Sequence, residues 1–176
     1  MLQRLAPGEY SQVYQILRDS FPKSERRTRE RQIKLMENEH YRIEVWREGD
    51  TVKAFLALWD FGDFLYVEHF AVGESYRNEG LGKKMLTELL SREKRLICLE
   101  VEPPQTEMAK RRIGFYERLG FFLQPYEYVQ PALRETEPSL PLMIMSYPRP
   151  ISREEFEKFR DTVYPQVYDQ HPCQEQ

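Results

Sequence analysis

The sequence has little cysteine and histidine, and this scarcity excludes several classes of protein. Its 176 residues include two cysteines, Cys98 and Cys173, and three histidines, too few for a disulfide framework or a cysteine–histidine metal set. Neither sign of charge is in large excess, since 26 Lys and Arg stand against 29 Asp and Glu. The net charge of −3 predicts no nucleic-acid partner. No apolar run approaches the ~18 residues of a membrane span, and no apolar signal segment opens the chain. We therefore expect a cytoplasmic protein that binds neither membrane nor metal.

The hydrophobic patterning predicts a single α+β domain. Tyr41, Ile43 and Val45 alternate with polar residues, which is typical of a half-buried strand. A turn and a second strand over residues 52–59 would complete an antiparallel hairpin. A strand over 64–72, a helix from residue 81 and a strand over 95–101 predict a parallel crossover. The pattern also predicts helices over 10–21, 24–38, 106–119 and 151–163, and strands over 2–5, 121–129 and 140–147.

A loop over residues 72–83 carries the most informative pattern. Gly80 and Gly82 stand where a strand gives way to a helix, and glycine lets backbone N–H groups approach an anion at a helix N-terminus. The spacing predicts a diphosphate ligand, although glycines that merely begin a helix are an alternative. A dinucleotide-binding G-x-G-x-x-G loop is excluded because Met85 occupies the third glycine position, and a Walker A loop because Lys84 replaces Ser or Thr.

Two motifs together resemble the GCN5-related N-acetyltransferase (GNAT) family. Arg77-x-x-Gly80-x-Gly82 is similar to the family's acetyl-CoA loop, and Tyr116-x-x-x-Gly120-Phe121 to a motif at the end of its next helix. The resemblance covers roughly residues 1–147, which we interpret as the acetyltransferase domain. Residues 148–176 would be a C-terminal helical extension and tail. The resemblance implies a mixed sheet flanked by helices, with antiparallel N-terminal strands and a parallel, splayed central pair.

The resemblance also implies the cosubstrate and the reaction. Acetyl-CoA would bind through the main chain of a strand end and through the amides of the loop that follows. The residues implied are Phe70, Ala71, Val72, Arg77, Asn78, Glu79, Gly80, Leu81, Gly82 and Lys83. The acetyl group would pass to a primary amine by direct attack in a ternary complex. We expect a small-molecule amine and a monomer or homodimer. Acetylation of a protein or peptide amine, or a non-catalytic acyl-CoA-binding module, are alternatives.

Two residues are the candidate catalytic groups. Tyr116 is the candidate acid, because a phenol titrates near ~10 and is protonated at neutral pH; a buried seam with Ala109 and Ile113 is the structural alternative. Glu68 is the candidate base, acting through water, because a carboxylate in an apolar strand is costly unless it is hydrated or paired. A structural, ion-paired acid is the alternative for Glu68. The rival bases are Glu100 and Glu102.

Several other residues receive structural or substrate-binding interpretations. Strand alternation points His69 away from Glu68, so we interpret it as a satisfied core histidine, and Cys98 as a buried apolar residue. The basic run over residues 23–34 is interpreted as a solvated helix face. The acceptor site is expected near residues 21–29 and 124–136, with Tyr126 and Tyr128 as walls. The acids expected to favour a cationic amine are Asp60, Asp63, Glu68, Glu100 and Glu102.

Overall fold

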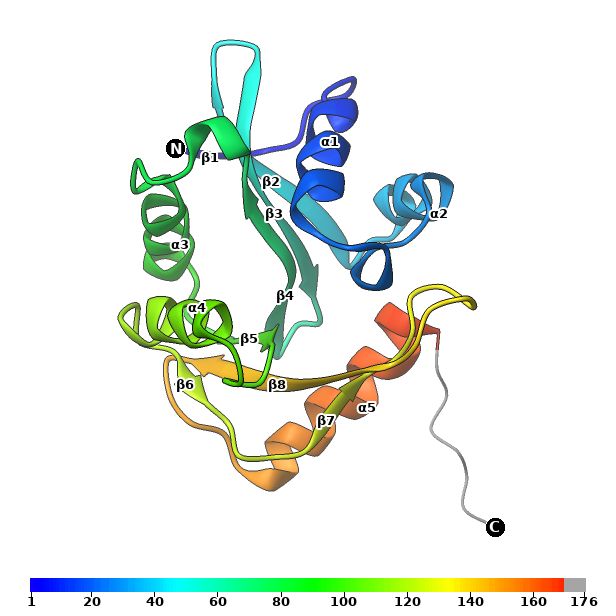
Figure 1. The fold of residues 1–176 in the computed structure, drawn as a ribbon, viewed down its shortest axis with the longest axis vertical. Helices are drawn as coiled ribbons and strands as arrows, with labels where there is room; N and C mark the ends of the chain where they lie inside the picture. The colour runs from blue at the N-terminus through cyan, green and yellow to red at the C-terminus, as the bar shows by residue number, and fades with distance from the viewer. Residues whose placement is uncertain (170–176) are drawn as a thin grey trace. The chain divides into compact units, whose positions relative to one another are not determined.

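The computed structural model describes residues 1–169, which form two compact units over residues 1–99 and 100–169 (Figure 1). Cys173 and the end of the predicted tail lie outside the described residues. Within the described chain, no helix is long and apolar enough to cross a membrane.

A mixed sheet organises the first unit. Strands β1 (Leu2–Arg4), β2 (Tyr41–Glu48), β3 (Thr51–Asp60) and β4 (Phe64–Val72) pair antiparallel in that order. The next strand, β5 (Leu96–Val101), pairs parallel with β4 over Phe64–Val67 and Leu96–Leu99. The mixed sheet predicted from the sequence is thereby confirmed. Since β4 continues to Val72, its last residues run beyond the stretch that pairs with β5 inside this unit.

Helices cover both faces of this sheet. Figure 1 shows α1 (Tyr10–Ser20) and α2 (Arg29–Lys34) on one side and α3 (Leu81–Arg92) on the other. The continuous helix predicted over residues 24–38 is wrong. Residues 26–28 are extended between the 3₁₀ turn η1 (Lys23–Glu25) and α2, which η2 (Leu35–Glu37) follows. Thr28 has β-region backbone and its side chain accepts a hydrogen bond from the Arg31 N–H, so it caps α2 rather than continuing a helix.

A β-bulge interrupts the pairing of β3 with β4. Ala57 pairs with His69, but the next residue, Leu58, pairs with Val67, which leaves Glu68 as the extra residue. A bulge bends the strand and redirects its side chains. The simple alternation used to point His69 away from Glu68 therefore fails at this position.

The second unit contains α4 (Glu107–Glu117), β6 (Phe122–Leu123), β7 (Tyr128–Gln130), β8 (Leu140–Tyr147) and α5 (Arg153–Tyr168). Strand β8 pairs antiparallel with both β6 and β7. The single strand predicted over residues 121–129 is wrong, because it breaks between β6 and β7. The break contains Pro125, which has no N–H for a strand ladder.

Helix α5 packs onto its own chain. Phe156, Phe159 and Val163 form an apolar stripe along the helix, and all three are buried. The Phe156 ring lies 4.9 Å from the Tyr126 ring and 6.3 Å from the Tyr128 ring, measured between centroids. The helix extends five residues past the predicted end at 163, and a Ser152–Glu155 capping box fixes its start.

Candidate active site

The predicted phosphate loop folds tightly against the end of β4. After the 3₁₀ turn η3 (Glu74–Tyr76), Arg77 Nε donates a hydrogen bond to the Val72 carbonyl at 3.1 Å, and Nη2 donates to Ser20 Oγ at 3.3 Å. These bonds tie the loop to β4 and to α1. Gly80 then adopts a left-handed conformation, with φ of 74°, and α3 begins. The first N–H groups of a helix lack intrahelical acceptors, so this turn suits an anion.

Gly82 allows α3 to approach the end of β4 closely. A Cβ atom at this position would lie 3.1 Å from Phe70 Cζ and 3.6 Å from Val72 Cγ2. The first distance is shorter than ordinary carbon contacts, so a side chain here would require the Phe70 ring or the helix start to shift by a few tenths of an ångström. The structure thus brings the predicted strand end and the predicted loop together.

Glu68 lies in a buried ion pair. Arg27 Nη1 is 2.5 Å from Glu68 Oε1, and each side chain is 2% exposed. Trp59 Nε1 donates a hydrogen bond of 2.8 Å to the other oxygen, Oε2. Burial alone would raise the pKa of Glu68, but the positive charge of Arg27 lowers it below the ordinary value. The carboxylate is therefore ionised at neutral pH.

His69 lies beside Glu68 rather than away from it. Its Nδ1 is 4.0 Å from Glu68 Oε2, and its Nε2 is 2.7 Å from the Glu25 carbonyl oxygen. The prediction of a core histidine is confirmed by its burial, but only one ring nitrogen is satisfied, because the buried Nδ1 has no hydrogen-bond partner in residues 1–169. Burial lowers the pKa of His69, so its ring is neutral at neutral pH.

Tyr116 lies in the second unit, on α4. Its side chain is buried in the predicted seam with Ala109 and Ile113, and its ring makes edge contacts with Phe115 and Phe121. Burial raises the pKa of Tyr116 to about 12, and Arg112 offsets part of this shift. The phenol is consequently protonated at neutral pH, as a proton donor must be.

The rival base Glu100 is held by several donors within the second unit. Its carboxylate accepts hydrogen bonds from the hydroxyl of Tyr128 at 2.5 Å, from Gln130 Nε2 at 2.6 Å and from the hydroxyl of Tyr168 at 2.9 and 3.0 Å. Glu102, the other rival, lies 3.7 Å from Arg112 on the surface. Glu100 therefore joins the end of β5 to β7 and α5.

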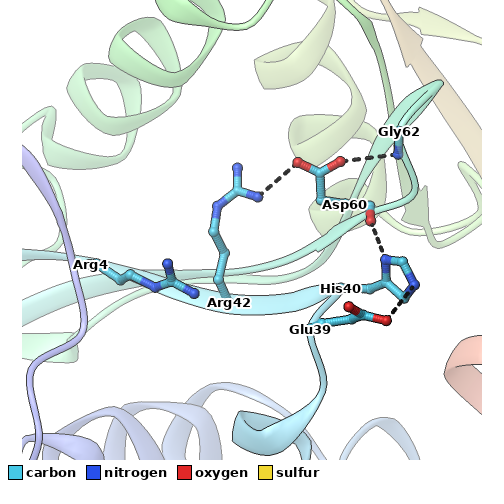
Figure 2. A pocket seen from close by; sticks show the side chains of 6 residues that line it. All are labelled: Arg4, Glu39, His40, Arg42, Asp60 and Gly62. Atoms are coloured by element: carbon cyan, nitrogen blue, oxygen red, sulfur yellow. Dashed lines mark hydrogen bonds and ion pairs between the residues drawn. The ribbon is translucent and has the colours of Figure 1, made fainter.

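Asp60 lines a polar pocket of about 380 Å³ (Figure 2). Both oxygens of its carboxylate accept hydrogen bonds from Arg95, at 2.7 and 3.0 Å, and one accepts another from Arg42 at 3.2 Å. These donors, Arg95 first, hold the pKa of Asp60 well below its usual range. Because its charge is compensated nearby, Asp60 contributes little to the attraction of a distant cation.

The sequence did not identify three residues that surround Glu68: Arg27, Trp59 and His69. Arg27 belongs to a basic run that was interpreted as a solvated face, yet its side chain is buried. A lone acid in an apolar strand was the available signal, since such an acid needs a cationic partner. The sequence alone did not indicate which of the neighbouring arginines supplies it.

Comparisons with known proteins agree with this geometry. The sequence model of the family described as "Acetyltransferase (GNAT) family" matches residues 10–121. A solved structure from Bacteroides thetaiotaomicron, assigned to the GNAT acetyltransferases, is 35% identical with a TM-score of 0.89, covering 96% of this chain and 98% of that one.

Two more distant solved structures share the fold. The ribosomal-protein-S18-alanine N-acetyltransferase of Escherichia coli is 21% identical with a TM-score of 0.62, covering 88% of this chain and 96% of its own. An aminoglycoside 6′-N-acetyltransferase in complex with coenzyme A is 18% identical with a TM-score of 0.59, covering 86% and 99%. At these identities the likeness concerns the fold alone.

Proposed function

Because the chain belongs to the GNAT family of acetyl-CoA-dependent acetyltransferases, we propose that it transfers the acetyl group of acetyl-CoA to a primary amine of a small molecule. The observation that carries the proposal is the loop and helix start held against the end of β4. There, Gly82 brings the first turn of α3 close to Phe70 and Val72. An acyl-CoA cosubstrate carries phosphates for the loop and an extended arm for the strand.

Different residues of the strand end and the loop would bind different parts of acetyl-CoA. The main chain of Phe70, Ala71 and Val72 would bind the pantetheine arm, as a strand binds another strand. The pyrophosphate would be held by main-chain amides of the loop, over Arg77, Asn78, Glu79, Gly80, Leu81, Gly82 and Lys83. Arg77 contributes by closing the loop, because its guanidinium donates to the Val72 carbonyl and to Ser20.

Two side chains would take part in proton transfer during the reaction. Acetyl-CoA supplies an activated acetyl thioester when it is bound. Tyr116, protonated because its pKa is about 12, would give a proton to the departing sulfur. Glu68 is ionised beside Arg27. It would act as a base through a water molecule and help to remove a proton from the amine. Holding both reactants in one site supplies a further large share of the rate, since effective molarities reach roughly 10⁵–10⁸ M.

Two solved structures of the same fold bear on the class of acceptor. The aminoglycoside enzyme shows that this fold serves small amines, whereas the ribosomal-protein enzyme acts on a protein. The structure weakens the simple charge argument for a cation, because Asp60 and Glu68 are paired with arginines. The choice of a small-molecule acceptor therefore rests on the likeness to the aminoglycoside enzyme.

One experiment tests the proposal directly. Purified protein is mixed with acetyl-CoA and a panel of amines, and free thiol release is measured alongside coenzyme A binding by calorimetry. The panel contains small monoamines, polyamines, aminoglycosides and peptides with free N-termini or lysines. We expect binding together with thiol release that is faster for a small amine than for any peptide. Release on peptides alone would replace the small-molecule acceptor, and binding without release would indicate a non-catalytic module.

A further inference from the structure

The hydrogen bonds of His69 fix which of its ring nitrogens carries a proton. Nε2 lies 2.7 Å from the carbonyl oxygen of Glu25. A carbonyl oxygen only accepts hydrogen bonds, so Nε2 carries the hydrogen in this pair. In the neutral ring, Nδ1 is therefore the nitrogen with a free electron pair.

This electron pair faces another acceptor. Nδ1 is buried and has no hydrogen-bond partner among residues 1–169, although His69 is only 4% exposed. Its neighbour is Glu68 Oε2, 4.0 Å away, which is too far for a direct hydrogen bond. Neither atom has a proton to give the other. A single donor about 2.8 Å from each atom would span this separation.

We propose that Glu68 Oε2 and His69 Nδ1 together bind one proton-donating group, a water molecule or the ammonium of the acceptor, and that His69 Nδ1 receives its proton during acetyl transfer. This inference rests on the proposed function. It assigns His69 a role as proton acceptor and makes Glu68 the anionic partner of the imidazolium that forms.

The proton transfer balances without another reagent. An N–H bond of the ammonium breaks, its electron pair stays on the amine nitrogen, and a new N–H bond forms at Nδ1. Where water bridges the groups, it gives one proton to Nδ1 and takes one from the ammonium, and so is regenerated. The imidazolium then donates to a bridging water, which donates to Glu68 Oε2, and it later returns its proton to solvent.

The surroundings of His69 support this assignment. The charge of Glu68 stabilises the imidazolium, and the opposing charge of Arg27 lies at the other carboxylate oxygen. The ring of Phe21 packs edge to face with that of His69, with centroids 4.7 Å apart, and this apolar contact favours the neutral imidazole before the reaction. Both acceptors lie at the β4 bulge, immediately before the strand end assigned to the pantetheine arm. The thioester carbon would thus be near the bulge.

The variant His69→Gln separates the base from its packing. Glutamine can keep an N–H donor to the Glu25 carbonyl but has no basic nitrogen. We expect kcat to fall tenfold or more, the acidic limb of the pH–rate profile to disappear, and the coenzyme A Kd to stay within twofold. The matched control is His40→Gln, which changes a histidine in the polar pocket of Figure 2 and should keep the wild-type rate. A His69→Gln enzyme with wild-type kcat and an unchanged limb would overturn the role of His69.

A second measurement does not depend on turnover. Long-range ¹H–¹⁵N NMR spectra of the wild-type protein should show His69 as the neutral Nε2–H form at pH 7. An Nδ1–H form would overturn the inference even in an active enzyme. The proposed function has a separate failure, which is wild-type protein that binds coenzyme A and releases no thiol with any amine. That result would overturn the catalytic role of His69 together with the activity, while leaving an Nε2–H spectrum in place.

Discussion

Arg27 Nη1 lies 2.5 Å from Glu68 Oε1, and both side chains are almost completely buried. The pair joins the extended residues that precede α2 to the bulge of β4. Two opposite charges inside a protein stabilise it little when compared with apolar residues, but removal of one leaves the other uncompensated. This pair therefore fixes the place of the α2 segment on the sheet as well as the state of the carboxylate.

Replacing Arg27 by Met should destabilise the protein strongly at neutral pH. The change leaves the Glu68 charge buried without a cation, which typically costs about 3–5 kcal/mol. Urea unfolding at pH 7 measures this loss. The double variant Arg27→Met, Glu68→Gln should be more stable than Arg27→Met alone, because no charge is then left unpaired. A double variant at least as unstable as the single one would contradict the importance of the ion pair.

The stability of the wild-type protein should fall as the pH is lowered from about 6.5. Burial holds the pKa of His69 below its ordinary value of 6.5, and Arg27 holds that of Glu68 below 4.5. The unfolded chain then binds more protons than the folded one, so acid favours unfolding. Stability from His69 is present above pH 6.5 and is lost below it; that from Glu68 is present above pH 4.5 and is lost below it. The urea midpoint of His69→Gln should vary less than that of wild type between pH 6.5 and 4.5, and an equal dependence would contradict a neutral, buried His69.

Replacing Tyr116 by Phe should lower kcat tenfold or more, within the range of about 10²–10⁴-fold that acid–base groups contribute. The coenzyme A Kd should stay unchanged, because the hydroxyl is assigned to the departing sulfur alone. With a pKa of about 12, wild-type Tyr116 should impose no basic limb on the rate below pH ~10. The control is Tyr164→Phe, which removes a hydroxyl bonded to the Val129 carbonyl. Equal turnover in wild type and Tyr116→Phe would remove Tyr116 as the acid.

The sequence predicted the elements that follow simple patterns. The β2–β3 hairpin, β4, α3 and the parallel β5 emerged from alternation and helical spacing, and the loop from its glycines. Each of these depends on residues close together in the chain.

The failures have longer-range causes. A bulge shifts the alternation of side chains along β4 by one residue. The residues around Glu68 carry no sequence pattern that marks the bulge, so His69 was placed on the wrong side of the strand. Arg27 lies 41 residues from Glu68, and only the tertiary structure shows that it is the arginine of the basic run whose side chain pairs with this acid. The short strands β6 and β7 were merged because aromatic residues continue across the Gln124–Pro125 break.

Replacing Gly82 by Ala should weaken coenzyme A binding tenfold or more. The new methyl group would lie 3.1 Å from Phe70 Cζ, so the Phe70 ring or the start of α3 must shift by a few tenths of an ångström, and we expect this shift to disturb the loop. Because Phe70 is assigned a main-chain role, Phe70→Leu should relieve the contact and restore part of the affinity. Gly80→Ala is the control for backbone strain: its φ is 74° and no atom lies within 4 Å of the new Cβ, so its loss of stability should be the roughly 1–2 kcal/mol of a left-handed alanine. Calorimetry measures the affinities for coenzyme A. Unaltered binding by Gly82→Ala would contradict the importance of the close contact between the start of α3 and the end of β4.

Replacing Glu100 by Gln should destabilise the second unit by about 2–3 kcal/mol. The native carboxylate accepts hydrogen bonds from Tyr128, Gln130 and Tyr168. A glutamine amide substitutes one donating group for an accepting oxygen and leaves two donors facing each other. The matched control is Glu102→Gln, two residues along the chain, whose carboxylate is 47% exposed and lies 3.7 Å from Arg112. An exposed ion pair of this kind is worth only about 0–1 kcal/mol. Urea unfolding of the two variants should therefore separate them clearly, whereas equal losses would show that Glu100 does not hold β7 and α5 in place.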